Sequence, residues 1–99
     1  MTKTYRVSIT TSAERDILDI WNYIFDDSKQ GAKKFIRQIE TEINKLKKYP
    51  QRCPVIKETE LLGIEYRHLV LGNYRIIFKL DAENVYIMRV IHGSRILKF

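Results

Sequence analysis

The sequence predicts an α+β fold in one domain over residues 1–99, built as strand, helix, helix and three antiparallel strands, with the helical hairpin packed on a small sheet. Apolar and polar residues alternate over residues 4–10, which is the period of a half-buried strand. Apolar residues then recur at helical spacing over residues 13–25 and 32–46. Gly72-Asn73 separates two apolar runs, and such a dipeptide is a strong hairpin signal.

The first helix is expected to follow the strand directly. Thr11-Ser12-Ala13-Glu14 has the pattern of a capping box, in which the Thr11 hydroxyl and the Glu14 carboxylate accept hydrogen bonds from free N–H groups at the helix start. Leu18 and Phe25 lie beside the main apolar stripe, so this helix has a second apolar flank. The stripe itself comprises Ala13, Ile17, Ile20, Trp21 and Ile24.

A second helix is predicted after Asp26-Asp27-Ser28, where Ser28 offers a new N-cap. Pro50 ends this helix, because the residue before a proline is biased away from helical conformation. Residues 50–64, with two prolines and a glycine, form a connector. Lys33 and Arg37 occupy faces away from the apolar stripe, which comprises Ala32, Phe35, Ile36, Ile39, Ile43 and Leu46.

The two-residue loop at Gly72-Asn73 fixes the register of the following hairpin. It places Leu71 opposite Tyr74 and makes one hairpin face mostly apolar, suited to packing on the helices. The other face is mixed, and it carries Tyr66, His68, Val70, Arg75, Ile77 and Lys79.

A second turn over residues 81–84 leads to a strand over residues 85–91. If this turn is a plain four-residue loop, His92 joins the mixed face. If this turn instead contains a bulge, Arg89 joins that face, because a one-residue slip moves every side chain to the opposite face. The sequence leaves both arrangements open.

Composition limits the classes of protein to consider. The chain has no apolar run approaching about 20 residues, so no spanning helix is expected, and its first residues lack the apolar core of a secretory signal. The one cysteine, Cys53, cannot form an internal disulfide, which favours the reducing cytoplasm. Two histidines without an acidic cluster predict no metal site, and no glycine-rich phosphate loop is present. We therefore expect no cofactor and no membrane partner.

The net charge of +6 is concentrated in one segment. Residues 28–52 hold eight basic and two acidic residues, whereas residues 1–27 hold three and five. This excess suits an acidic partner or a nucleic acid, and it equally suits a solvated helix face.

Four segments carry a family resemblance in the same order along the chain. They are Ala-Glu-Arg-Asp-Ile-Leu-Asp-Ile-Trp-Asn-Tyr-Ile at 13–24, Tyr49-Pro50, Gly-Asn-Tyr-Arg-Ile-Ile-Phe at 72–78, and Arg-Val-Ile-His-Gly-Ser-Arg at 89–95. Together they resemble the RelE/ParE superfamily of toxins from bacterial type II toxin–antitoxin systems, and the first and last are closer to the ParE-like branch. The resemblance implies a cytoplasmic toxin that a cognate antitoxin neutralises.

The resemblance implies two alternative activities. ParE-like members bind and poison DNA gyrase without catalysis, and here the target-binding residues would be Arg95, Ile96, Leu97, Lys98 and Phe99, with one or two of the apolar ones packing back on the sheet. RelE-like members cleave mRNA on the ribosome, and here the catalytic residues would be Arg75, His68, His92 and Arg95. Of these, Arg75 matches the hairpin arginine of the nuclease pattern, but its two strand lysines are replaced by Tyr66 and His68. A third alternative is a non-toxic member that only binds its antitoxin.

Structural roles compete with these assignments. Arg75 could equally pair with a carboxylate of a helix, and His68 could be a half-buried sheet histidine. For the antitoxin, an amphipathic segment is expected to dock on the first helix through Leu18, Trp21 and Phe25, with Lys33 and Arg37 of the second helix attracting acidic residues. Trp21 is also a natural core residue.

Overall fold

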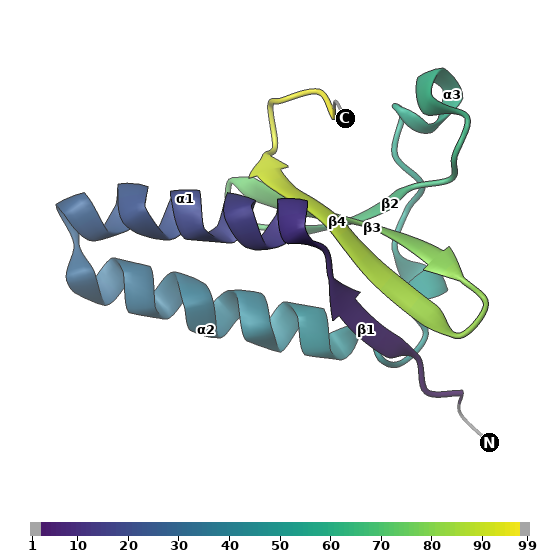
Figure 1. The fold of residues 1–99 in the computed structure, drawn as a ribbon, viewed down its shortest axis with the longest axis horizontal. Coiled ribbons are helices and arrows are strands. Elements are labelled where there is room, and N and C mark those ends of the chain that lie inside the picture. Colours follow the sequence, from purple (N-terminus) through teal and green to yellow (C-terminus); the bar gives the residue numbers. More distant parts are fainter. Residues whose placement is uncertain (1–2, 98–99) are drawn as a thin grey trace.

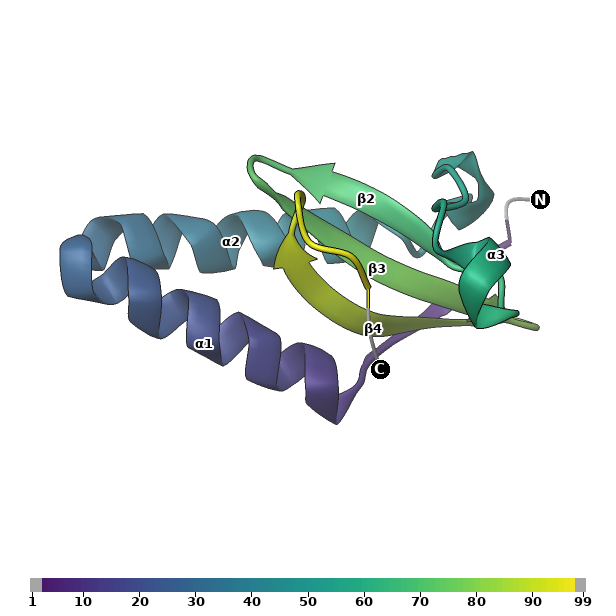
Figure 2. The same cartoon turned by 90° about the horizontal axis from the view of Figure 1, so that it is seen from above.

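The computed structural model describes residues 3–97, and Figures 1 and 2 show its two layers. A four-stranded sheet has the order β1-β4-β3-β2; the hairpin of α1 and α2 covers one face, and α3 with the C-terminal segment lies over the other. The α+β fold class is confirmed. The elements are β1 (Arg6–Ile9), α1 (Thr11–Asp27), α2 (Lys29–Lys45), a 3-10 turn (Pro50–Arg52), α3 (Thr59–Leu62), β2 (Arg67–Leu71), β3 (Tyr74–Asp81) and β4 (Asn84–His92).

The first helix begins as expected, but the capping residue was predicted one position too late. Thr10, not Thr11, is the N-cap, and its side chain accepts a hydrogen bond from the Ala13 amide. The reason is a tertiary contact, because the Thr10 hydroxyl also donates to the Ile87 carbonyl at 2.8 Å and so stays at the end of β1. The predicted break at Ser28 is confirmed, since its hydroxyl accepts from the Gly31 amide at 2.9 Å.

The connector contains more regular structure than expected. Helix α2 ends at Lys45, before Pro50, and the chain reaches the proline through a turn in which Tyr49 takes the left-handed φ of 50°. Tyr49 thus avoids the right-handed helical region that the following proline disfavours, but it is left-handed and not extended. The single-turn helix α3 then ends at Leu62 and is capped by Gly63, whose φ is 71°.

The hairpin register predicted from Gly72-Asn73 is confirmed, with Leu71 paired to Tyr74. The register of β3 with β4 shifts between Ile77 and Phe78. The turn itself is plain, since Leu80 pairs with Val85 and Asp81 with Asn84, so a bulge in the turn is wrong. The bulge lies within the strands instead, and it places Arg89 opposite Ile77 on the mixed face. His92 pairs with Tyr74 on the face toward the helices.

Each face of the sheet has its own apolar core. The larger core joins the helical hairpin to the sheet and includes Phe35, Ile39, Leu46, Ile76, Phe78, Val85 and Ile87. The smaller core lies beneath the C-terminal segment and comprises Ile56, Tyr66, Ile77, Ile91 and Leu97. The predicted mixed face is therefore partly a second interior.

Candidate functional site

The C-terminal segment returns across the sheet, with residues 93–96 exposed and Leu97 buried (Figure 1). Leu97 is buried at 3% exposure in the smaller core, whereas Ile96 is 58% exposed and Arg95 is also exposed. Leu97 therefore anchors the segment and is not available for direct target contact, which corrects its assignment. Lys98 and Phe99 lie outside the described residues.

A buried ion pair holds this segment from below. Arg75 donates through Nη1 to Glu58 Oε1 at 3.3 Å and through Nη2 to Oε2, and the exposure of the two side chains is 7% and 2%. Arg75 Nη2 also donates to the Arg95 carbonyl at 2.5 Å, and Glu58 Oε2 accepts from the Leu97 amide at 2.9 Å. The Arg75 bond, opposed by burial, lowers the pKa of Glu58 to about 2. Arg75 is thus committed to an internal pair.

Three of the four nuclease candidates come together. His68, Arg75 and Arg95 line a cavity of about 330 Å³ beside Lys57 and Ser94. His68 is half-buried, and its Nδ1 has no hydrogen-bond partner among the described residues. Burial, with Arg75 nearby, lowers the pKa of His68, so the ring is neutral near pH 7.

The fourth candidate lies apart from this cavity. His92 is exposed; its Nδ1 is 2.8 Å from the Ser94 hydroxyl, and its ring packs edge-on against Tyr74 with centroids 5.8 Å apart. The bulge in β3–β4 accounts for this placement. His92 is therefore not part of one constellation with His68, Arg75 and Arg95.

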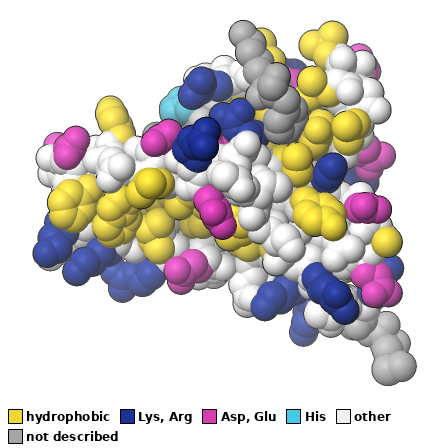
Figure 3. Space-filling model, in the orientation of Figure 1, with side chains coloured by type: hydrophobic (Ala, Val, Ile, Leu, Met, Phe, Trp, Pro, Cys, Tyr) yellow, Lys and Arg dark blue, Asp and Glu magenta, His cyan; other side chains and the backbone are white. Residues whose placement is uncertain are grey.

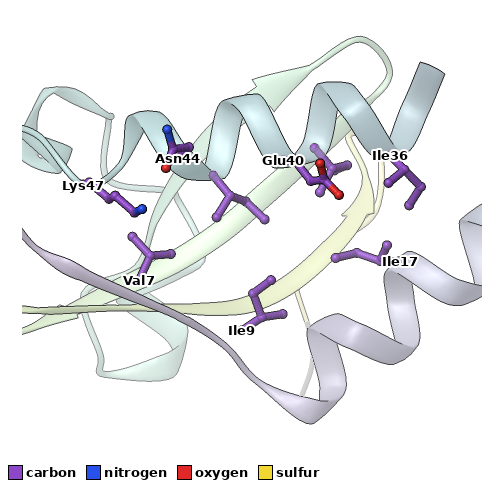
Figure 4. Close-up of a pocket in the computed structure, with 9 residues that line it drawn as sticks. Val7, Ile9, Ile17, Ile36, Glu40, Asn44 and Lys47 are labelled. Atoms are coloured by element: carbon purple, nitrogen blue, oxygen red, sulfur yellow. The ribbon is translucent and has the colours of Figure 1, made fainter. Parts of the chain in front are cut away.

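An apolar groove lies on the other side of the molecule, between β1, α1 and α2. Its volume is about 350 Å³, and Figure 4 shows Ile17 and Ile36 pointing toward one another across it, with Val7 and Ile9 below. Polar side chains at one rim come from α2 and the turn after it: Glu40, Asn44 and Lys47. The groove is open to solvent and otherwise aliphatic.

The apolar flank predicted on α1 continues this groove. Trp21 follows Ile17 by one helical turn and Phe25 follows Trp21 by another, so the three lie along one side of the helix. The rings of Trp21 and Phe25 stack with centroids 5.8 Å apart, and Leu18 beside them is 57% exposed. Figure 3 shows hydrophobic side chains gathered over the helical hairpin. Trp21 is half-buried, so it packs partly against the protein and still presents part of its ring on the surface.

The expected basic residues are exposed on α2. Lys33 and Arg37 are one turn apart and, with Lys34, surround a shallow hollow near the start of the helix. Figure 3 shows Lys and Arg side chains along the α2 side of the hydrophobic band. The apolar and cationic surfaces thus adjoin on one helical hairpin.

Sequence reasoning missed two carboxylates. Glu58 was hidden in the connector, where its position in sequence carries no information about Arg75. Asp16 accepts from Arg89 Nε at 2.6 Å, from Arg89 Nη2 at 3.0 Å and from the Val90 amide at 2.9 Å, and thereby ties α1 to the part of β4 beyond its pairing with β1. Only the position of Asp16 beside the apolar stripe of α1 hinted at such a contact.

Within residues 3–97, no three His, Cys, Asp or Glu side chains are placed to hold a metal ion. No helix in this range is long and apolar enough to cross a membrane.

Comparison with known proteins gives a consistent family. Residues 7–97 match the family described as the ParE toxin of the type II toxin–antitoxin system parDE. A solved structure of a chromosomal ParDE system from P. aeruginosa has a TM-score of 0.72 at 18% identity, covering 91% of this chain and 97% of that chain. A chain of the RelBE2 toxin–antitoxin complex from Mycobacterium tuberculosis has a TM-score of 0.56 at 23% identity, covering 90% and 98%. No curated protein gave a significant match. Because the family match spans nearly the whole chain, this protein belongs to the ParE toxin family of type II toxin–antitoxin systems.

Proposed function

We propose that this chain arrests growth by binding DNA gyrase in the cytoplasm, and that a cognate antitoxin holds it inactive. The main support for this proposal is the burial and hydrogen bonding of Arg75, the residue that matches the nuclease pattern. Its guanidinium is 7% exposed and bonded to Glu58 and to the Arg95 carbonyl, so it is not free to stabilise a reacting phosphate. The neighbouring Arg95 and Ile96 are exposed and suit a binding surface.

The target surface in this proposal is the C-terminal segment. Arg95 and Ile96 supply a cation and an apolar anchor on the outer side of the segment, and Lys98 and Phe99 are proposed with them from the sequence. A surface of this kind needs shape and charge and does not need proton transfer. It is therefore compatible with the separation of His92 from His68.

The antitoxin surface in this proposal is the groove together with the flank of Leu18, Trp21 and Phe25. An amphipathic helix can place its apolar face in such a groove. Its acidic residues would meet Lys33 and Arg37 at the edge of the same surface. The names of the ParDE and RelBE2 structures describe toxin–antitoxin assemblies, which supports a protein antitoxin as the occupant.

A second candidate is ribosome-dependent mRNA cleavage, and one observation favours it. The unpartnered, neutral ring of His68 shares a cavity with the cations Arg75 and Arg95, and a neutral imidazole can accept a proton. In this reading, Arg75 must leave Glu58 to reach a substrate.

Pulse-labelling after toxin induction separates the alternatives. Gyrase poisoning predicts an early block in thymidine incorporation while methionine incorporation continues. An immediate block in methionine incorporation would instead support mRNA cleavage and direct mutagenesis to His68, Arg75 and Arg95. Unimpaired growth would leave only the antitoxin-binding role.

A further inference from the structure

Two backbone groups on either side of Ile96 are held by one ion pair. The Arg95 carbonyl accepts from Arg75, and the Leu97 amide donates to Glu58. The intervening side chain, Ile96, is 58% exposed, and the next one, Leu97, is 3% exposed. The pair therefore fixes which side chain of this segment faces outward.

We propose that Glu58 and Arg75 are positioning residues that hold Arg95 and Ile96 in the conformation that engages the toxin's target. This inference rests on the proposed function, in which the C-terminal segment is the target surface. Glu58 and Arg75 are the only buried charged pair among the described residues, and the inference gives them a role in function as well as in stability.

The chemistry of Glu58 explains why this position requires a carboxylate. Both of its oxygens accept hydrogen bonds from Arg75, and one of them also accepts from the Leu97 amide. A glutamine has the same shape but only one acceptor oxygen, and its NH2 group would face a donor in either orientation. Glu58→Gln therefore loosens the hold on the segment without leaving a cavity.

Packing of Leu97 alone does not fix the outward position of Ile96. Leu97 enters the smaller core through its side chain, where it meets Ile56, Tyr66, Ile77 and Ile91. Hydrogen bonds to the backbone set the position of the main chain above that core, because they are directional while apolar contact is not. The segment needs both.

The structure offers a matched control at a second carboxylate. Asp16 also accepts two bonds from an arginine and one from a backbone amide, that of Val90, but it holds β4 and makes no bond to residues 95–97. Asp16→Asn removes the same kind of interaction by the same chemistry. It therefore controls for a general loss of stability.

The test compares the full-length wild type, Glu58→Gln and Asp16→Asn. Amide hydrogen exchange at Leu97 should accelerate by about tenfold or more in Glu58→Gln, as loss of a hydrogen bond to a charged group predicts, while Asp16→Asn leaves it at the wild-type rate. Growth arrest on induction should weaken in Glu58→Gln and persist in Asp16→Asn. Antitoxin affinity should be equal in the wild type and Glu58→Gln, because Glu58 lies outside the helical hairpin that carries the proposed antitoxin surface.

The outcomes separate the failure of this proposal from that of the proposed function. Unchanged exchange at Leu97 in Glu58→Gln, or faster exchange with growth arrest equal to that of Asp16→Asn, would overturn the positioning role. Growth arrest does not require that gyrase be the target, so a wild type that arrests growth without affecting gyrase refutes only the proposed target. Leu97→Ala provides a positive control for release of the segment.

Discussion

Replacing Arg75 by methionine would remove the cation of the buried pair while retaining much of its volume. Glu58, 2% exposed, would keep only backbone groups as partners, the Leu97 amide and its own. Removing one member of a buried pair costs about 3–5 kcal/mol, because the remaining charge stays desolvated. The pKa of Glu58 is lowered to about 2 with the Arg75 hydrogen bond as the largest cause, which agrees in direction.

The loss of stability in Arg75→Met should depend on pH. In the wild type, the lowered pKa of Glu58 contributes stability that is fully present above pH 4.5 and is lost as the pH falls toward about 2. In Arg75→Met, the largest cause of the lowered pKa is gone while burial remains, so the pKa of Glu58 should rise from its wild-type value. The variant should therefore lose more stability near pH 7 than near pH 4, where more of the carboxyl is protonated.

Urea unfolding of the isolated toxin, followed by circular dichroism at both pH values, measures these differences. The exposed Lys45–Glu42 pair is the control, and Glu42→Gln should change stability by about 1 kcal/mol or less. The double variant Glu58→Gln/Arg75→Met should recover part of the loss, since it removes the unpaired charge. A loss below about 1 kcal/mol in Arg75→Met, with the wild-type pH dependence, would refute the assignment of this arginine as a buried structural partner.

Three further predictions concern other surfaces. Ile36→Glu should lower antitoxin affinity, measured by calorimetry, by about tenfold or more, because it places a charge in the groove. Leu18→Glu should also lower this affinity, because Leu18 lies on the adjoining flank. Unchanged affinity with intact folds would reject that surface. The double variant Lys33→Glu/Arg37→Glu should slow antitoxin association at low salt. The difference from the wild-type rate should shrink as added salt shortens the Debye length below about 10 Å. Equal association rates at low salt, measured by stopped flow, would contradict electrostatic steering. Gly72→Ala should cost about 1 kcal/mol in urea unfolding, because φ is 56° while an added Cβ meets nothing within 4 Å; an unchanged midpoint would show that the turn relaxes.

Local signals in the sequence were sufficient for most of the fold. The helices follow from the spacing of apolar residues, and the register of Leu71 with Tyr74 follows from a two-residue turn. The cap at Thr10 was misplaced because its hydroxyl is held by Ile87, which is distant in sequence. The bulge after Ile77 has no signal in composition or turn length.

The candidate site was less predictable, because it depends on pairs of residues from distant segments. Whether Arg75 serves in catalysis or structure is decided by Glu58, and no local pattern links a connector residue to a strand residue. Likewise, the apolar residues of the C-terminal segment indicated that one or two of them pack back on the sheet, but only the fold selects Leu97 and leaves Ile96 outside.

Gyrase is the proposed target, and DNA supercoiling by purified gyrase measures its inhibition without other cell components. Added wild-type toxin should inhibit supercoiling in a dose-dependent manner, Ile96→Asp should inhibit less, and antitoxin should restore activity. Full supercoiling activity at saturating toxin, together with cleavage of mRNA on purified ribosomes by the same preparation, would exclude gyrase as the target.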